Sequence, residues 1–155
     1  MNQPPSDIQL ALKCWFLTGA TASGKTKVSL ELARILDAEI ISLDSMAIYR
    51  GMDIGTAKPD SAQRSAVPHH LIDIVDPPES FSVSEYRDSA LSKIREIHES
   101  GKQVLFVGGT ALYLKALLRG LFEGPPADWD FRKEIEQEIE NSGAEFLHQR
   151  LAMID

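Results

Sequence analysis

The sequence predicts an α/β fold in which helices flank a parallel sheet. Short apolar runs, rich in β-branched or aromatic residues, alternate with stretches whose apolar residues recur at helical spacing. The first run, residues 14–18, leads into a glycine-rich turn and then a helix over residues 25–36. A second run, residues 39–44, follows that helix after a short turn. Strand–helix–strand units of this kind form parallel sheets, so the two runs are predicted to be parallel strands.

The next stretch, from Met46 to about Phe81, is predicted to be a long loop. It is punctuated by Pro and Gly, and only residues 71–75 (LIDIV) resemble a short strand. A loop of this length in a compact domain is usually functional. His69 and His70 lie in it, but adjacent histidines rarely ligate one metal, and no Cys or Glu at ligand spacing accompanies them. We therefore expect no metal at the histidine pair.

A second strand–helix region follows the loop. Ser82 to Glu85 have the S-x-x-E spacing of a capping box, which opens a helix that stops at Gly101. Residues 103–109 (QVLFVGG) form the strongest strand signal after the first run, and Thr110 is placed to cap the helix that ends at Gly120. These elements complete the predicted α/β core.

The C-terminal part has a different character. After residues 123–128 (EGPPAD), two amphipathic helices separated near Gly143 are predicted, and the strand signals stop. Three strong strands and one weak one are few for a doubly wound sheet, so we expect the fold to be incomplete. The predicted organisation is a flexible leader (1–13), an α/β core (14–122) and the start of a helical module (123–155).

Composition narrows the class of protein. The 155 residues are 43% hydrophobic and 25% charged, as in soluble globular proteins. The net charge of -7 argues against a domain that holds nucleic acid through bulk positive charge. The single cysteine, Cys14, lies in an apolar run and is expected to be a buried thiol in a reducing compartment. No apolar stretch approaches the roughly 20 residues of a membrane span, and no signal peptide is visible, so a cytoplasmic protein without membrane contact is expected.

The glycine-rich turn GATASGKT matches the phosphate-binding pattern G-x-x-x-x-G-K-[ST], which predicts a P-loop NTPase-like sheet of the nucleotide- and ATP-binding kind. Lys25 would place its charge on a phosphate, and the Thr26 hydroxyl can hold Mg²⁺. The N-terminus of the following helix adds to the anion site. The predicted phosphate-binding residues are Gly19, Ala20, Thr21, Ala22, Ser23, Gly24, Lys25 and Thr26.

The partner carboxylate for this loop has one clear candidate. The strand over residues 103–109 ends in two glycines, whereas the strand over residues 39–44 ends in Asp44. Strand ends of a parallel sheet meet at one edge, so Asp44 should emerge beside the phosphate loop. It is predicted to be a general base or a Mg²⁺ partner, with a turn or cap residue as the alternative. Gly108 and Gly109 bring a second turn to this edge, where they serve either the site or the close packing of strand and helix.

Four segments together are similar to the bacterial tRNA dimethylallyltransferase family: GATASGKT, ISLDSMAIYRGMDIGTAKP, VPHHLID and LFVGGTALYLKALLRGL. The resemblance runs from about Trp15 to the end, and DSMAIYRGMDIGTAKP is its most specific part. Ala20 stands where the family usually has proline, and Ala47 where many members have glutamine. Family members are roughly twice as long, so the chain is expected to be a partial one that stops inside a helical insertion.

The resemblance implies transfer of a dimethylallyl group from dimethylallyl diphosphate to N6 of the adenosine beside the tRNA anticodon. The phosphate loop would hold the donor diphosphate, with Lys25 and Thr26 as catalytic residues and Mg²⁺ near Thr26. Asp44 would be the general base. The residues implied to contact the anticodon stem-loop are Asp44, Ser45, Met46, Ala47, Thr110 and Arg132. A monomer is the expected state.

Three alternatives remain open on the sequence. A nucleotide or small-molecule kinase could use the same loop, with Asp44 positioning an acceptor hydroxyl. An isopentenyltransferase that modifies free adenine nucleotides, a close relative of the tRNA-modifying family, is a second alternative. The chain could also be a fragment that binds diphosphate without catalysing transfer.

Overall fold

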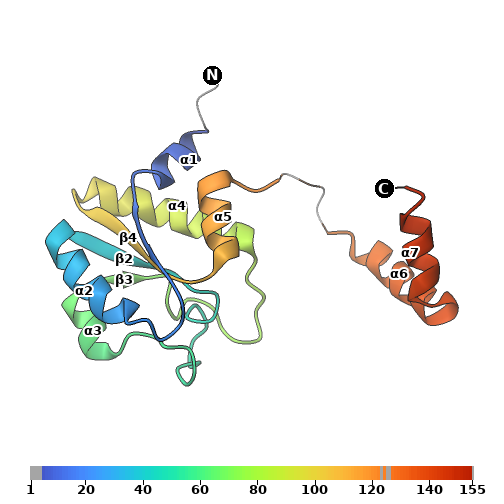
Figure 1. The fold of residues 1–155 in the computed structure, drawn as a ribbon, viewed down its shortest axis with the longest axis horizontal. Coiled ribbons are helices and arrows are strands. Elements are labelled where there is room, and N and C mark those ends of the chain that lie inside the picture. Colours follow the sequence, from blue (N-terminus) through green and yellow to red (C-terminus); the bar gives the residue numbers. More distant parts are fainter. Residues whose placement is uncertain (1–4, 123, 125–126, 155) are drawn as a thin grey trace. The chain divides into compact units, whose positions relative to one another are not determined.

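The computed structural model describes residues 5–122, 124 and 127–154. The chain divides into two compact units, Met1–Leu121 and Phe122–Asp155 (Figure 1). The predicted boundary between residues 122 and 123 falls beside Glu123, Pro125 and Pro126, which lie outside the described residues.

The first unit is built on a parallel sheet of four strands in the order β1-β4-β2-β3. The strands are β1 (Trp15–Thr18), β4 (Gln103–Gly108), β2 (Ala38–Leu43) and β3 (His69–His70). Gly108 is in register with both Thr18 and Leu43, so three strands end at one edge. The parallel α/β sheet predicted from the sequence is confirmed.

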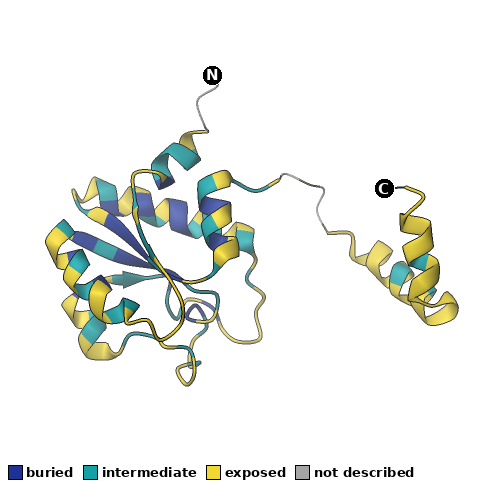
Figure 2. Cartoon of the chain, viewed as in Figure 1, coloured by how far each residue is buried: buried dark blue, intermediate teal, exposed yellow. Residues whose placement is uncertain are grey.

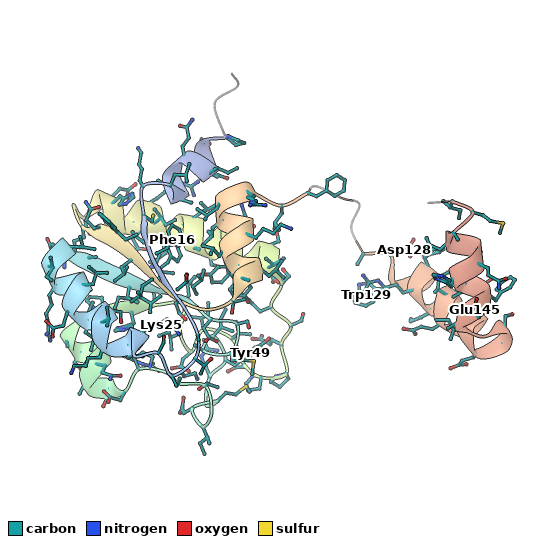
Figure 3. The ribbon with its side chains drawn as sticks, in the orientation of Figure 1. Phe16, Lys25, Tyr49, Asp128, Trp129 and Glu145 are labelled. Atoms are coloured by element: carbon teal, nitrogen blue, oxygen red, sulfur yellow. The ribbon has the colours of Figure 1, made fainter. Side chains whose placement is uncertain are left out.

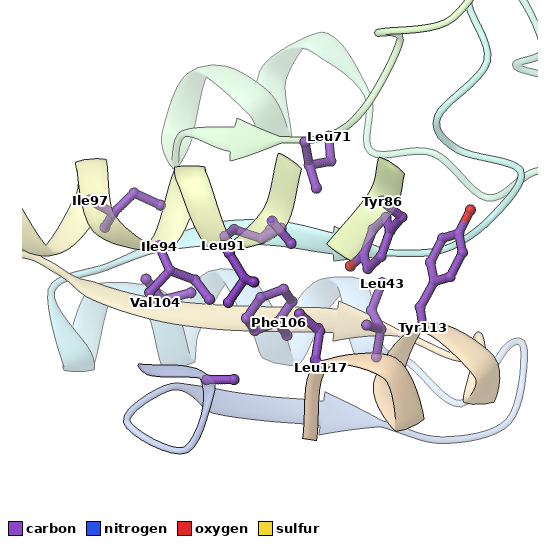
Figure 4. Close-up of a cluster of buried hydrophobic side chains, with 13 residues drawn as sticks. Leu43, Leu71, Tyr86, Leu91, Ile94, Ile97, Val104, Phe106, Tyr113 and Leu117 are labelled. Atoms are coloured by element: carbon purple, nitrogen blue, oxygen red, sulfur yellow. The ribbon is translucent and has the colours of Figure 1, made fainter. Parts of the chain in front are cut away.

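Helices cover both faces of the sheet (Figure 1). Helix α2 (Lys25–Leu36) packs on one face, where Ala33, Ile40 and Leu105 form a small buried core. Helices α4 (Val83–Glu99) and α5 (Ala111–Arg119) cover the other face, where the larger core lies (Figures 2 and 4). Its central side chains are Ile41, Leu43, Tyr86, Ile94, Val104, Phe106 and Leu117. This core packs β2 and β4 against α4 and α5.

Two helices were missed in the sequence, and one strand was misplaced. Ser6–Ala11, part of the predicted flexible leader, forms helix α1, and Ala11 is fully buried in the larger core. Ser61–Ala66 forms helix α3 inside the predicted loop, opened by a capping box between Asp60 and Gln63. The predicted strand over residues 71–75 is wrong: the paired residues are His69 and His70. Leu71 and Asp73 have left-handed backbone (φ +56°), which interrupts any strand there.

The α4 capping box is as predicted. The Ser82 side chain accepts a hydrogen bond from the Glu85 backbone N–H, and the Glu85 carboxylate accepts one from the Ser82 N–H. These bonds satisfy backbone donors that would otherwise be orphaned at the helix start. Hydrogen bonding to Ser82 lowers the pKa of Glu85.

The second unit contains helices α6 (Trp129–Ser142) and α7 (Ala144–Leu151), divided at Gly143 as predicted. The Asp128 carboxylate accepts from the Phe131 N–H at the start of α6, and Arg150 pairs with Glu138 at 2.7 Å. None of the described residues of these helices is buried. Across the described parts of the chain, no helix is long and apolar enough to cross a membrane.

Candidate active site

An open cavity of about 730 Å³ lies at the carboxyl edge of the sheet. All eight residues of the phosphate loop line it, together with Asp44 and Thr110. Ser45, Met46 and Ala47 also line it, so residues predicted from three separate segments meet at one site. Arg132 is not among the lining residues: it belongs to the second unit, where its guanidinium lies 4.8 Å from the centre of the Trp129 ring.

The phosphate loop closes directly into α2. Gly24, in left-handed conformation (φ +83°), is the N-cap residue, and no side chain caps the helix. The first backbone N–H groups of α2 are therefore available to an anion in the cavity. The Lys25 ammonium lies beside the loop and donates to the carbonyls of Gly19 (2.9 Å) and Ala20 (2.6 Å) (Figure 3). A phosphate in the cavity would compete with these carbonyls for the same ammonium.

Asp44 follows the last residue of β2 and closes a tight turn. Its Oδ1 atom accepts from the backbone N–H groups of Met46 (2.8 Å) and Ala47 (3.2 Å). The turn role raised as an alternative in the sequence is therefore present. These two bonds use one carboxylate oxygen, which leaves Oδ2 for a group in the cavity. The structure is compatible with a base at this position as well.

The Gly108–Thr110 turn locks the ends of two strands together. A side-chain carbon at Gly108 would lie 2.2 Å from the Leu43 carbonyl oxygen, so only glycine fits there. The same oxygen accepts from the backbone N–H groups of Gly109 and Thr110, each at 3.1 Å. Close packing is thus the role of Gly108.

Thr110 does not cap α5 as predicted. It occupies the N-cap position, but its side chain makes no capping bond. Instead, its Oγ1 accepts from the backbone N–H of Ser45 at 3.0 Å. This bond competes with capping for the same oxygen, and it ties α5 to the turn that follows Asp44.

Two buried tyrosines support the strand end behind Asp44. The Tyr86 hydroxyl donates to the Ser42 carbonyl at 2.8 Å, and the Tyr86 and Tyr113 rings stack 3.7 Å apart (Figure 4). Burial raises the pKa of Tyr86 well above its usual value, so the hydroxyl stays protonated and keeps donating. Burial, and then the neighbouring Tyr49 and Asp44, raise the pKa of Tyr113.

The two adjacent histidines point to opposite faces of the sheet, as neighbours in a strand do. His70 Nε2 lies 2.6 Å from a Glu39 carboxylate oxygen, on the face of the larger core. His69 lines the cavity, and its Nδ1 donates to the Val67 carbonyl at 2.7 Å. Burial, together with the charges of Arg64 and His70, lowers the pKa of His69 although the Val67 bond opposes the shift. The pair does not converge on one point.

Sequence reasoning missed the far wall of the cavity. Gly55, Thr56, Ala57, Lys58 and Pro59 form this wall, and Ser29 of α2 and Ser42 of β2 also line the cavity. The long predicted loop gave the general region, but no local pattern marked these residues as neighbours of the phosphate loop. Residues 55–59 reach the cavity through contacts between segments that are distant in sequence.

The donor set around the phosphate loop suits Mg²⁺ bound mainly through phosphate. Thr26 contributes a hydroxyl to the cavity lining beside the phosphate loop. Protein sites for Mg²⁺ commonly use one or two such oxygens, with substrate phosphates and water as the other ligands. Within the described residues, no group of three or more His, Cys, Asp or Glu side chains could hold a metal alone.

Sequence comparison identifies relatives over most of the chain. The profile of the IPP transferase family matches residues 47–155. A tRNA dimethylallyltransferase of Methylococcus capsulatus is 55% identical over 139 residues, which cover 90% of this chain and 45% of the relative. One of Rhodopirellula baltica is 50% identical over 147 residues, covering 90% of this chain and 44% of the relative. The chain thus spans somewhat under half the length of these relatives.

Two solved structures of transferases are similar to this chain over most of its length. The full-length tRNA isopentenylpyrophosphate transferase of Bacillus halodurans superposes with a TM-score of 0.70 at 49% identity, over 92% of this chain and 48% of that one. A eukaryotic dimethylallyltransferase, described as acting on tRNA, gives a TM-score of 0.69 at 28% identity, over 83% of this chain and 32% of its own.

Proposed function

The chain belongs to the IPP transferase family, and on that premise we propose that it supplies the donor-binding half of a tRNA dimethylallyltransferase site. One observation carries the proposal: the phosphate loop and the Asp44–Ala47 turn line the same cavity. The donor diphosphate and the acceptor base would therefore meet in one open cavity. A volume of about 730 Å³ is in the range of small-molecule sites.

The donor side holds the leaving group. The loop N–H groups and the start of α2 would bind the diphosphate of dimethylallyl diphosphate, and the Lys25 ammonium would exchange the Gly19 and Ala20 carbonyls for phosphate oxygens. As the bond between the allylic carbon and the diphosphate oxygen breaks, negative charge develops on the diphosphate. Donors already aimed at that position stabilise it without reorganising.

On the acceptor side of the cavity, a base would remove a proton from the attacking amine. The exocyclic N6 of adenosine would form a bond to the allylic carbon while diphosphate departs, and one N6 proton must be lost. Asp44 Oδ2 would take this proton, since Oδ1 is occupied by the Met46 and Ala47 N–H groups. The adenosine would have to leave its stack to reach the cavity, where Ser45, Met46, Ala47 and Thr110 would surround it.

The proposal extends to the metal, the tRNA contacts and the setting. Thr26 would hold Mg²⁺, which neutralises charge on a bound diphosphate. Arg132, exposed on α6, would contact tRNA. The protein would work as a monomer in the cytoplasm, where tRNA is available.

A prenylation assay tests the proposal. This chain would be joined to the C-terminal part of the Methylococcus capsulatus relative, in place of the segment it matches, and incubated with dimethylallyl diphosphate and tRNA. We expect prenylated adenosine in tRNA from the chimera, with the intact relative as positive control. A chimera that folds and binds tRNA but transfers no prenyl group would contradict the proposal.

Competition experiments on this chain separate the alternatives. Dimethylallyl diphosphate should displace inorganic diphosphate from the loop, and ATP should compete only weakly. Tight ATP binding with transfer of its terminal phosphate would identify a kinase. Prenylation of free adenine nucleotides, but not of tRNA, would identify the isopentenyltransferase that acts on nucleotides.

A further inference from the structure

Lys58 is a buried lysine in the far wall of the cavity. Its side chain is 3% exposed although it lines a site for an anion. The ammonium donates to the Tyr49 carbonyl at 2.5 Å, to Asp73 Oδ1 at 2.7 Å and to Asp53 Oδ1 at 3.1 Å. An ammonium has three N–H donors, so these three acceptors account for all of them.

The main partner of Lys58, Asp73, is itself held from two sides. Its second oxygen, Oδ2, accepts from Arg64 Nη1 at 2.6 Å, and Arg64 Nε donates to the Pro59 carbonyl at 2.9 Å. Burial raises the pKa of Asp73, but the hydrogen bonds and charges of Lys58 and Arg64 outweigh it and lower the pKa overall. Burial likewise lowers the pKa of Lys58, and bonding to Asp73 and Asp53 raises it overall. Both groups are therefore charged near neutral pH.

The network joins segments that are distant in sequence. Through Tyr49 it reaches the turn after Asp44, and Tyr49 itself lies beside Val75 in an isolated parallel bridge. The same two stretches are joined where the Asp73 N–H donates to the Ala47 carbonyl at 3.2 Å. Through Pro59 the network reaches the Gly55–Pro59 wall.

We propose that Lys58 is a positioning residue that holds the acceptor-side wall of the cavity, Met46–Ala47 and Gly55–Pro59, and that it is not a phosphate ligand. Lys25 contrasts with it, because its exposed ammonium donates to two carbonyls of the phosphate loop and, among the described residues, to no carboxylate. For Lys58 to reach a phosphate, it would have to leave two carboxylates behind. That exchange would break three hydrogen bonds of the ammonium, two of them charge-assisted bonds to carboxylates.

The role of Lys58 in binding the acceptor rests on the proposed function. The contacts by which Lys58 holds the wall are independent of that function. Inorganic diphosphate binding and amide hydrogen exchange therefore form the first test, on this chain. In Lys58→Met, we expect the Kd for inorganic diphosphate to stay within twofold of the unsubstituted chain, whereas Lys25→Ala should weaken it tenfold or more. The Arg50, Ile74 and Val75 amides, which bond across the two turns, should exchange at least tenfold faster in Lys58→Met.

Matched variants separate local positioning from general damage. Lys102→Met removes a lysine whose ion pairs are long (3.9 Å), and it should leave both measurements unchanged. Lys58→Arg keeps the charge and should restore part of the amide protection. Should Lys58→Met fail to fold, Asp53→Asn removes one exposed partner and should raise exchange at the same amides to a lesser degree.

Two results would overturn the inference. A Kd for diphosphate weakened in Lys58→Met as much as in Lys25→Ala would make Lys58 a phosphate ligand. Unchanged exchange at the two turns would show that Lys58 does not hold the wall. In the chimera, Lys58→Met should raise the KM for tRNA at least tenfold and leave the KM for the donor unchanged. If the chimera without the substitution is inactive, that result contradicts the proposed function and leaves the inference about Lys58 to the two measurements on this chain.

Discussion

Replacing Gly108 by alanine should destabilise the first unit more than any other single methyl group added at the site. The new carbon would lie 2.2 Å from the Leu43 oxygen, 2.4 Å from its carbonyl carbon and 2.9 Å from its Cα. Ordinary contact needs about 3.5 Å, so β4 and β2 would have to separate by about 1 Å at their ends. Overpacking of this kind costs about 1–3 kcal/mol. Loss of the Gly109 and Thr110 bonds to the Leu43 oxygen adds about 1 kcal/mol each.

Urea unfolding measures the effect. A loss of about 3–5 kcal/mol is a large share of the 5–15 kcal/mol of a typical domain. With a slope of about 1–3 kcal/mol per molar urea, a loss of about 3 kcal/mol lowers the midpoint by roughly 1–3 M. Gly109→Ala is the matched control, because its new carbon meets only the Gly19 oxygen at 3.6 Å. Equal midpoints for the two variants would refute the reasoning.

Three further predictions concern individual side chains. Asp44→Ala should lower prenyl transfer by the chimera about 10²–10⁴-fold, the usual contribution of a general base, while leaving donor affinity intact; unchanged turnover would remove the base assignment. Burial raises the pKa of Cys14 to about 12, so iodoacetamide at pH 8 should label it on the order of a thousandfold more slowly than a small thiol. Equal labelling rates would show that the thiol is accessible. Because the pKa of His69 is lowered, its contribution to stability is complete above about pH 6.5 and is lost as pH falls through the lowered value. The free energy of unfolding should thus fall more steeply below pH 6.5 than in His69→Asn, and parallel curves would contradict this.

The sequence predicted the parts of the fold whose signals are local. The phosphate loop, the Ser82–Glu85 capping box and the apolar strands each lie within a few consecutive residues, so their patterns could be recognised without knowing the fold. Asp44 was placed at the cavity by the rule that parallel strands end at one edge. The D-x-x-Q spacing of Asp60 and Gln63 was an available signal for α3, but the helix is short and has no apolar repeat.

The rest depended on contacts that no local pattern records. Thr110 was predicted to cap α5, the common role of a threonine at that position. Its Oγ1 instead accepts a hydrogen bond from the backbone N–H of Ser45, 65 residues away in the sequence. The misplaced strand has a similar origin. Residues 71–75 have strand-like composition, yet the backbone turns at Leu71 and Asp73 so that Asp73 can meet Lys58 and Arg64. Tertiary pairing outweighed propensity there.

The charges of the cavity indicate how an acidic chain could still bind a diphosphate. Among the described residues, two lysines line the site, but Lys58 is neutralised by Asp73 and Asp53, so its charge is not available to a ligand. The remaining ammonium, Lys25, is balanced by the Asp44 carboxylate on the same lining. Side chains therefore supply little net positive charge for a group that carries several negative ones. Within the part of the chain that the structure describes, the N–H groups of the loop and of α2 supply attraction, and a cation that enters with the ligand would add to it, which is the physical reason for proposing Mg²⁺ beside Thr26.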